Sequence, residues 1–90
     1  MLFIVNDAHN YTLLKALSKQ KENIRVMYDP VPKTIDKNEK KIYVNIKPPR
    51  EDDICFIDSW GLSEEIPQAH IVSKQDDAQK LRIICEVLRI

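Results

Sequence analysis

The fold is decided by residues 2–28, which read LFIVNDAHNYTLLKALSKQKENIRVMY. The first four form a short, wholly apolar run that ends at Asn6 and Asp7, as expected of a strand buried on both faces. Asn6 or Asp7 can cap the helix that follows, in which apolar residues recur at helical spacing as far as Gln20. In the last five residues, Ile24, Val26 and Tyr28 alternate with Arg25 and Met27, which predicts a second strand. Strand, helix and strand in this order predict a βαβ unit with parallel strands.

The remainder of the chain adds three expected strands and one helix. The strands are expected at residues 42–46, 54–57 and 70–72. Only seven residues separate the first two, too few for a helical crossover, so we expect these strands to pair as a hairpin. Ser73, with Asp76 three residues later, resembles a capping box that opens the last helix. The apolar stripe of that helix is formed by Ala78, Leu81, Ile84, Cys85 and Leu88.

These elements predict one α/β domain over residues 1–90, in the order β-α-β-β-β-α. The expected sheet is mixed and has four or five strands. Strands 2–5 and 54–57 are apolar on both faces, which places them centrally, and the two helices are expected to cover opposite faces.

Composition limits the classes of function. The chain has 90 residues and equal numbers of basic and acidic side chains, so it is too small for a multi-domain enzyme and a poor generic polyanion binder. Residues 1–50 carry a net charge of +5 and residues 51–90 one of −5. No run approaches the length that a bilayer requires, no signal peptide is visible, and Cys55 and Cys85 form no CxxC pair. We therefore expect a cytoplasmic protein with reduced, buried cysteines and no membrane contact.

The scarcity of glycine excludes several nucleotide-binding and hydrolase motifs. Gly61 is the only glycine, so the chain holds no GxGxxG loop, no P-loop and no GxSxG nucleophile elbow. These motifs need glycine where backbone must approach a phosphate closely or turn sharply. A dinucleotide site of the Rossmann type is therefore ruled out.

Three acidic residues follow expected strands and are candidates for chemistry. Asp7, Asp29 and Asp58 would share one edge of the sheet if their strands ran parallel. Two or three carboxylates there could hold Mg²⁺ for phosphoryl or phosphodiester hydrolysis, with His9 as a general base. Alternatively, Asp7 is a helix cap, the other two are turn residues, and His9 is a surface histidine, in which case no cofactor is expected.

A loop after the strand at 54–57 has the composition of an interface anchor. One tryptophan stands among apolar and acidic residues, which together give Trp60, Leu62, Glu64, Glu65 and Ile66. The alternative is a tryptophan folded over the core. The alternating strand 42–46 offers a second contact, by edge pairing with another chain or in a homodimer.

A basic segment supplies a further alternative. It could contact a nucleic acid backbone and stack one base, through Lys33, Lys37, Lys40, Lys41, Tyr43, Lys47 and Arg50. Lysines on a solvated loop and an edge strand explain the same pattern.

Taken together, these features favour a small protein-binding or regulatory module over an enzyme. Many lysines, isoleucines and asparagines, with few alanines, indicate A/T-rich coding, which is common in phages and mobile elements. We therefore expect an inhibitor or adaptor that acts through the Trp60 loop. The metal-dependent hydrolase and the nucleic-acid-binding domain remain the alternatives.

Overall fold

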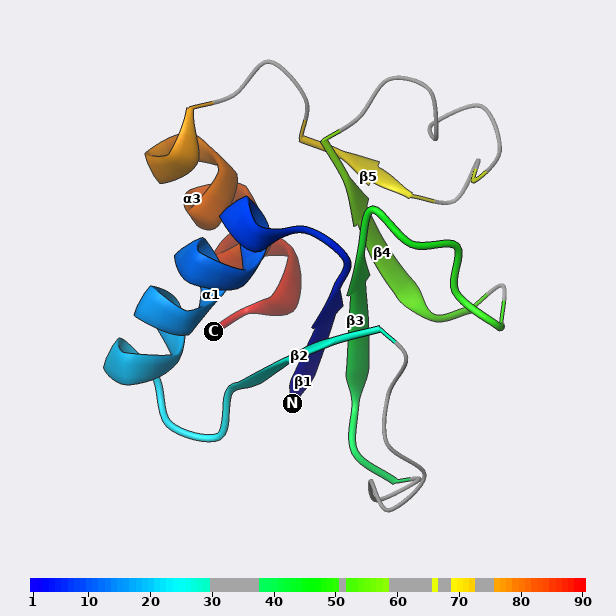
Figure 1. Cartoon of the computed structure of the whole chain (residues 1–90), viewed down its shortest axis with the longest axis horizontal. Helices are drawn as coiled ribbons and strands as arrows, with labels where there is room; N and C mark the ends of the chain where they lie inside the picture. Colours follow the sequence, from blue (N-terminus) through cyan, green and yellow to red (C-terminus); the bar gives the residue numbers. More distant parts are fainter. Residues whose placement is uncertain (30–37, 51, 59–65, 67–68, 73–75) are drawn as a thin grey trace.

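The computed structural model describes residues 1–29, 38–50, 52–58, 66, 69–72 and 76–90. Within them, the elements follow the predicted order (Figure 1): β1 (Leu2–Val5), α1 (Ala8–Gln20), β2 (Arg25–Tyr28), β3 (Lys41–Val44), β4 (Ile54–Ile57), β5 (His70–Ile71) and α3 (Asp77–Leu88). The predicted α/β class is confirmed, and the described part of the chain holds two helices and a five-stranded sheet. Neither helix is long and apolar enough to cross a membrane.

The sheet is parallel throughout its described pairings, with strand order β2-β1-β3-β4-β5. The predicted mixed sheet is therefore wrong, and so is the predicted hairpin, because Ile42 of β3 pairs with Ile54 of β4 in parallel register. Nine residues join these two strands, and in extended form they reach about 30 Å. A four-residue strand is only about 13 Å long. The connection can therefore return the chain to the starting edge without a helix.

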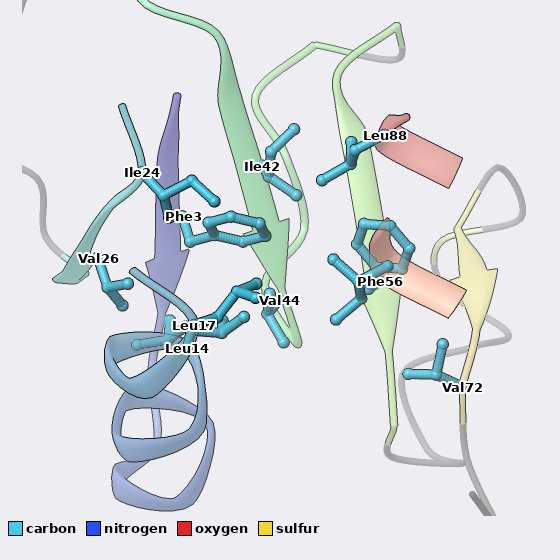
Figure 2. Packing of buried hydrophobic residues seen from close by; sticks show 12 residues of the cluster. Phe3, Leu14, Leu17, Ile24, Val26, Ile42, Val44, Phe56, Val72 and Leu88 are labelled. Atoms are coloured by element: carbon cyan, nitrogen blue, oxygen red, sulfur yellow. The ribbon is translucent and has the colours of Figure 1, made fainter. Parts of the chain in front are cut away.

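Both helices pack on the same face of the sheet, which corrects the expectation of opposite faces. Leu14 of α1 and Leu88 of α3 share one cluster of buried side chains with Phe3 of β1 and Phe56 of β4. Figure 1 shows α1 and α3 side by side on one side of the strands, and Figure 2 shows Leu14 and Leu17 against Phe3 and Val44. The sequence did not reveal this, because a strand that is apolar on both faces does not say which face receives a helix.

The other face of the sheet is equally apolar. Every β1 side chain is 0% exposed, so both faces are shielded from water. A second cluster gathers on the face away from the helices and contains Leu2, Ile4, Tyr43, Cys55, Ile57 and Ile66. Of the described helices, none contributes a residue to this cluster.

The edges of the sheet differ from those expected. Strand 42–46, predicted to be exposed, corresponds to β3, which lies between β1 and β4 in the middle of the sheet. The outer strands are β2 and β5. Asn45 ends β3 in the left-handed backbone region with φ 59°, a conformation that asparagine tolerates better than most residues.

The last helix begins three residues later than predicted, and its buried face agrees with most of the predicted stripe. Asp76 itself is the N-cap and accepts a hydrogen bond from the backbone N–H of Gln79, while Ser73 lies outside the described residues. The buried side chains are Lys80, Ile84 and Leu88, spaced four residues apart, whereas Ala78 is exposed. Leu81 and Cys85 of the predicted stripe are half-buried against the same core, and Lys80, which the prediction did not include, begins the buried positions.

Candidate functional site

A polar cluster lies at the carboxyl edge of the parallel strands. We call it the edge cluster and define it as Asp7, Asn10, Asn45, Asp58 and Lys80. Its members come from the ends of β1, β3 and β4 and from the two helices. The strand order reverses between β1 and β3, and this is where ligands gather in open α/β sheets. Position in the fold therefore makes the edge cluster the first candidate for function.

Asp58 is the centre of the edge cluster. Its Oδ2 accepts hydrogen bonds from Lys80 Nζ at 2.9 Å and from Asn10 Nδ2 at 3.0 Å. Its Oδ1 accepts one from Asn45 Nδ2, and its own backbone N–H donates to Asn45 Oδ1 at 2.9 Å. Both carboxylate oxygens are therefore bonded to other groups of the protein.

Lys80 supplies the positive charge. The residue is only 5% exposed, and an isolated ammonium at that depth would be costly. Its Nζ donates to Asp58 and, at 3.3 Å, to Asn10 Oδ1, and it lies 4.0 Å from Asp77 Oδ1. These partners explain why a lysine can occupy the buried face of α3.

Asn10 connects the two carboxylates. It is 2% exposed, and its Nδ2 donates to Asp7 Oδ1 at 2.9 Å as well as to Asp58. Asp7 also caps α1, because its Oδ2 accepts the backbone N–H of Asn10 at 3.0 Å. The helix-cap alternative for Asp7 is thus what the structure contains, together with a link to Asp58.

The hydrogen bonds of the edge cluster decide the charge state of Asp58. Burial acts to raise the pKa of this carboxyl group. Hydrogen bonds from Lys80, Asn10 and Asn45 outweigh burial, so the pKa lies below its ordinary value. Asp58 is therefore an ionised acceptor near neutral pH and has no proton to give as a general acid.

The other catalytic candidates lie elsewhere. His9 is exposed, and its Nε2 lies 2.9 Å from Asp77 Oδ1, not beside Asp58. Asp29 follows the outer strand β2 and is exposed, while its backbone N–H donates to Val5. Asp7 and Asp58 therefore both belong to the edge cluster, whereas His9 and Asp29 do not.

The arrangement limits what metal chemistry the edge could support. In the described part of the chain, no group of three or more His, Cys, Asp and Glu side chains could hold a metal ion. A Mg²⁺ ion at Asp7 and Asp58 would compete with Lys80, whose ammonium already lies on Asp58. Magnesium would have to break this ion pair to gain the carboxylate ligands that it prefers.

The sequence placed Asp7 and Asp58 at this edge, but it did not point to Asn45 and Lys80. Asn45 lies within the strand expected at residues 42–46. Asparagine is, however, common where the backbone adopts the left-handed conformation, as it does here. Lys80 precedes Ile84 and Leu88 by four and eight residues. That spacing was the available signal, because it places the lysine in their stripe.

Most of the expected partner-binding loop lies outside the described residues, including Trp60, Leu62, Glu64 and Glu65. Ile66 is described and is 1% exposed, within the second cluster. This side chain packs in the protein core and is not on the surface.

The basic segment is partly gathered around a cavity. Lys40, Lys41, Tyr43 and Arg50 line a hollow of about 400 Å³ at the amino ends of β3 and β4. Lys47 is exposed and does not line it. Lys33 and Lys37 lie outside the described residues. Four of the seven residues proposed for nucleic acid contact therefore meet at one place.

Comparison of the chain with protein-family models, with curated proteins and with solved structures finds no match in any of the three.

Proposed function

We propose that the chain is a small cytoplasmic protein-binding module with a regulatory role, as an inhibitor or adaptor of the kind phages and mobile elements carry. Its contact surface would be the outer strand β5 together with the connection from β4 that holds Trp60. The observation that carries the proposal is the exposure of Ile71 in β5. At 47%, it is the most exposed large apolar side chain of the described residues.

The position of β5 supports this surface. The strand pairs with β4 on one side, and its other side pairs with no strand in the described part of the sheet. Unpaired backbone groups on an outer strand are a template for a strand from another chain. A neighbouring apolar side chain such as Ile71 adds the contact area that a partner would bury.

The edge cluster supports the choice of a binding module over an enzyme. Its two carboxylates hold α1 and α3 to the strand ends, through the Asp7 cap and the pair of Asp58 with Lys80. Groups that could have served as acid, base or metal ligand are thus used for internal contacts. The activity of the molecule would then originate at its surface.

Site-specific photo-crosslinking tests the proposal. A photoreactive phenylalanine analogue replaces Ile71 in one variant, and Lys19, an exposed residue of α1, in a matched control. After irradiation in cells of the native host, mass spectrometry identifies the covalent products. We expect one protein to be captured from position 71 and not from position 19, and Trp60→Ala to reduce the yield.

Two outcomes would revise the proposal. Capture of the same proteins from both positions means that β5 has no specific partner, which overturns it. Crosslinks between two copies of the chain identify the partner as a second copy and make the module a homodimer through β5. Circular dichroism of each variant shows that it is folded.

A second candidate function is contact with single-stranded nucleic acid, and the cavity lined by Lys40, Lys41, Tyr43 and Arg50 favours it. Lysine and arginine neutralise phosphates, so binding should weaken as salt rises. We expect a labelled oligonucleotide of about 12 nucleotides to bind, and Lys40→Glu with Lys41→Glu to abolish binding. Fluorescence anisotropy at two salt concentrations is the measurement.

The matched control reverses two exposed lysines at the end of α1, Lys19→Glu with Lys21→Glu. It changes the net charge by the same amount without touching the cavity. If both double variants lose binding equally, the interaction follows overall charge and the second candidate function fails.

A further inference from the structure

The cavity lies at the edge of the sheet opposite the edge cluster. Lys41 is the first residue of β3 and Ile54 the first of β4, and both line it. Because the strands are parallel, these amino ends are separated from the carboxyl ends by the length of the strands. A volume of about 400 Å³ falls in the range of small-molecule sites. The cavity can thus bind a ligand independently of the edge cluster.

The cationic side chains of the cavity are available to a ligand. Within the described residues, no hydrogen bond or ion pair engages the side chains of Lys40, Lys41 and Arg50. Glu39 also lines the cavity, but Arg25 pairs with it and lowers the pKa of its carboxyl group. Arg25 thus compensates the charge of Glu39, and the three cations that line the cavity can face a phosphate.

Two carboxylates complete the charge pattern. Asp52 and Asp53 line the same cavity, and neither forms an ion pair with another described residue. The pKa of the Tyr43 phenol is raised by burial first and then by the charges of Asp53 and Asp29, while Arg50 acts in the opposite sense. Charges of both signs therefore act on the buried ring of Tyr43, which lines the cavity.

We propose that this cavity binds one nucleotide unit whose base carries an exocyclic amino group, with cytidine monophosphate as the simplest example. The phosphate would lie against Lys40, Lys41 and Arg50, the amino group would donate to Asp53 or Asp52, and the ring would rest on Pro49 and Ile54. This inference rests on the second candidate function and specifies its ligand.

The carboxylates make the ligand distinguishable from a close analogue. Cytosine presents an N4 amino donor, and acidic side chains are suited to accept from it. Uracil presents an oxygen acceptor at the same position, which a carboxylate repels. We expect cytidine monophosphate to bind about tenfold more tightly than uridine monophosphate.

A titration followed by amide NMR tests the inference with three probes: cytidine monophosphate, uridine monophosphate and ribose 5-phosphate. We expect shifts at residues around the cavity with all three and the tightest binding for cytidine monophosphate. Asp53→Asn and Asp52→Asn identify the carboxylate involved, because one of them should remove the preference over uridine and leave ribose 5-phosphate binding intact. Lys41→Gln should weaken all three, whereas Lys19→Gln on α1 should change none.

Failure of this inference is separable from failure of the second candidate function. Equal affinity for the cytidine and uridine nucleotides, or shifts centred outside the cavity, overturns the inference. If the oligonucleotide still binds and depends on Lys40 and Lys41, the second candidate function stands without it. If neither mononucleotide nor oligonucleotide binds, both fail.

Discussion

Lys80 is the residue on which the arrangement of the C-terminal helix depends. It faces the sheet from α3 with Ile84 and Leu88, yet it ends in a charge that apolar neighbours cannot satisfy. The oxygens of Asp58 and Asn10 accept its hydrogen bonds. Such a pair adds little net stability over apolar side chains, but removing one partner leaves the other charge without compensation.

We predict that Lys80→Met lowers the free energy of unfolding by about 2–4 kcal/mol, because Asp58 then loses its counter-charge at a partly buried position. Urea denaturation at neutral pH measures the loss. The double variant Lys80→Met, Asp58→Asn should recover part of it, since no uncompensated charge remains. Lys19→Met, at an exposed position of the other helix, is the control and should have little effect. An equal loss in both single variants would contradict the assignment.

The stability of the fold should depend on pH through Asp58. Its pKa in the folded protein lies below the ordinary value, so the unfolded chain binds the proton more readily. The stabilisation is fully present above about pH 5 and is lost as the pH falls through about 4 towards the folded pKa. Urea midpoints over this range should fall for the native chain. The difference between native and Asp58→Asn stabilities should shrink over the same range, and a constant difference would contradict the prediction.

At the scale of single residues, sequence reasoning succeeded where one local rule applies. Asp7 stands between an apolar strand and an amphipathic helix, so its capping role could be predicted from neighbours alone. Asn45 and Lys80 depend on Asp58, at sequence distances of 13 and 22 residues. They meet only because β3 and β4 are parallel and α3 packs with Lys80 at the end of β4.

At the scale of elements, the strands were predicted within one or two residues, and the parallel pairing of β1 with β2 is confirmed, but the direction of β4 relative to β3 was wrong. The hairpin between β3 and β4 was inferred from a short connection, on the assumption that a parallel crossover needs a helix. The nine residues present are enough to cross a strand of four. Short strands therefore weaken any inference from connection length to strand direction.

The N-cap of the last helix, α3, can be tested by substitution. Asp76 caps it by accepting the backbone N–H of Gln79 at 2.8 Å. We predict that Asp76→Ala costs about 1 kcal/mol of unfolding free energy, whereas Asp76→Asn, which keeps an accepting oxygen, costs only a few tenths. Thermal unfolding of both variants gives the comparison. Equal losses would show that the charge, and not the cap, is what stabilises α3.

At the scale of the whole molecule, the sheet has two chemically similar faces and an unequal distribution of helices. Both helices lie over the cluster that contains Phe3 and Phe56, while Cys55 belongs to the cluster on the other face. Sequence patterns revealed that β1 and β4 are buried on both faces. The sequence patterns could not show which face of the sheet the helices cover, because this depends on how the strands and helices are connected.

Cys55 can report on the face that the helices leave uncovered. Burial raises the pKa of its thiol to about 11, although hydrogen bonding with the backbone of Ile46 acts in the opposite sense. We predict that in a Cys85→Ser chain Cys55 reacts with a disulfide reagent at least about a hundredfold more slowly than in the urea-denatured chain. The release of the coloured thiolate measures the rate. Reaction at a rate close to the denatured one would show that this face opens readily.

The position of β1 determines how the molecule would exchange its amide hydrogens with deuterated water. β1 is bonded to β2 on one side and β3 on the other, and its side chains are shielded on both faces. Its amides can exchange only when the sheet itself opens, so their rates report the free energy of global unfolding. Those of β5, a two-residue outer strand, should exchange through local opening. The amides of β5, at the proposed binding edge, would therefore exchange first and those of β1 last. A partner bound to β5 would slow exchange at the β5 amides and leave the order among the slowly exchanging amides unchanged.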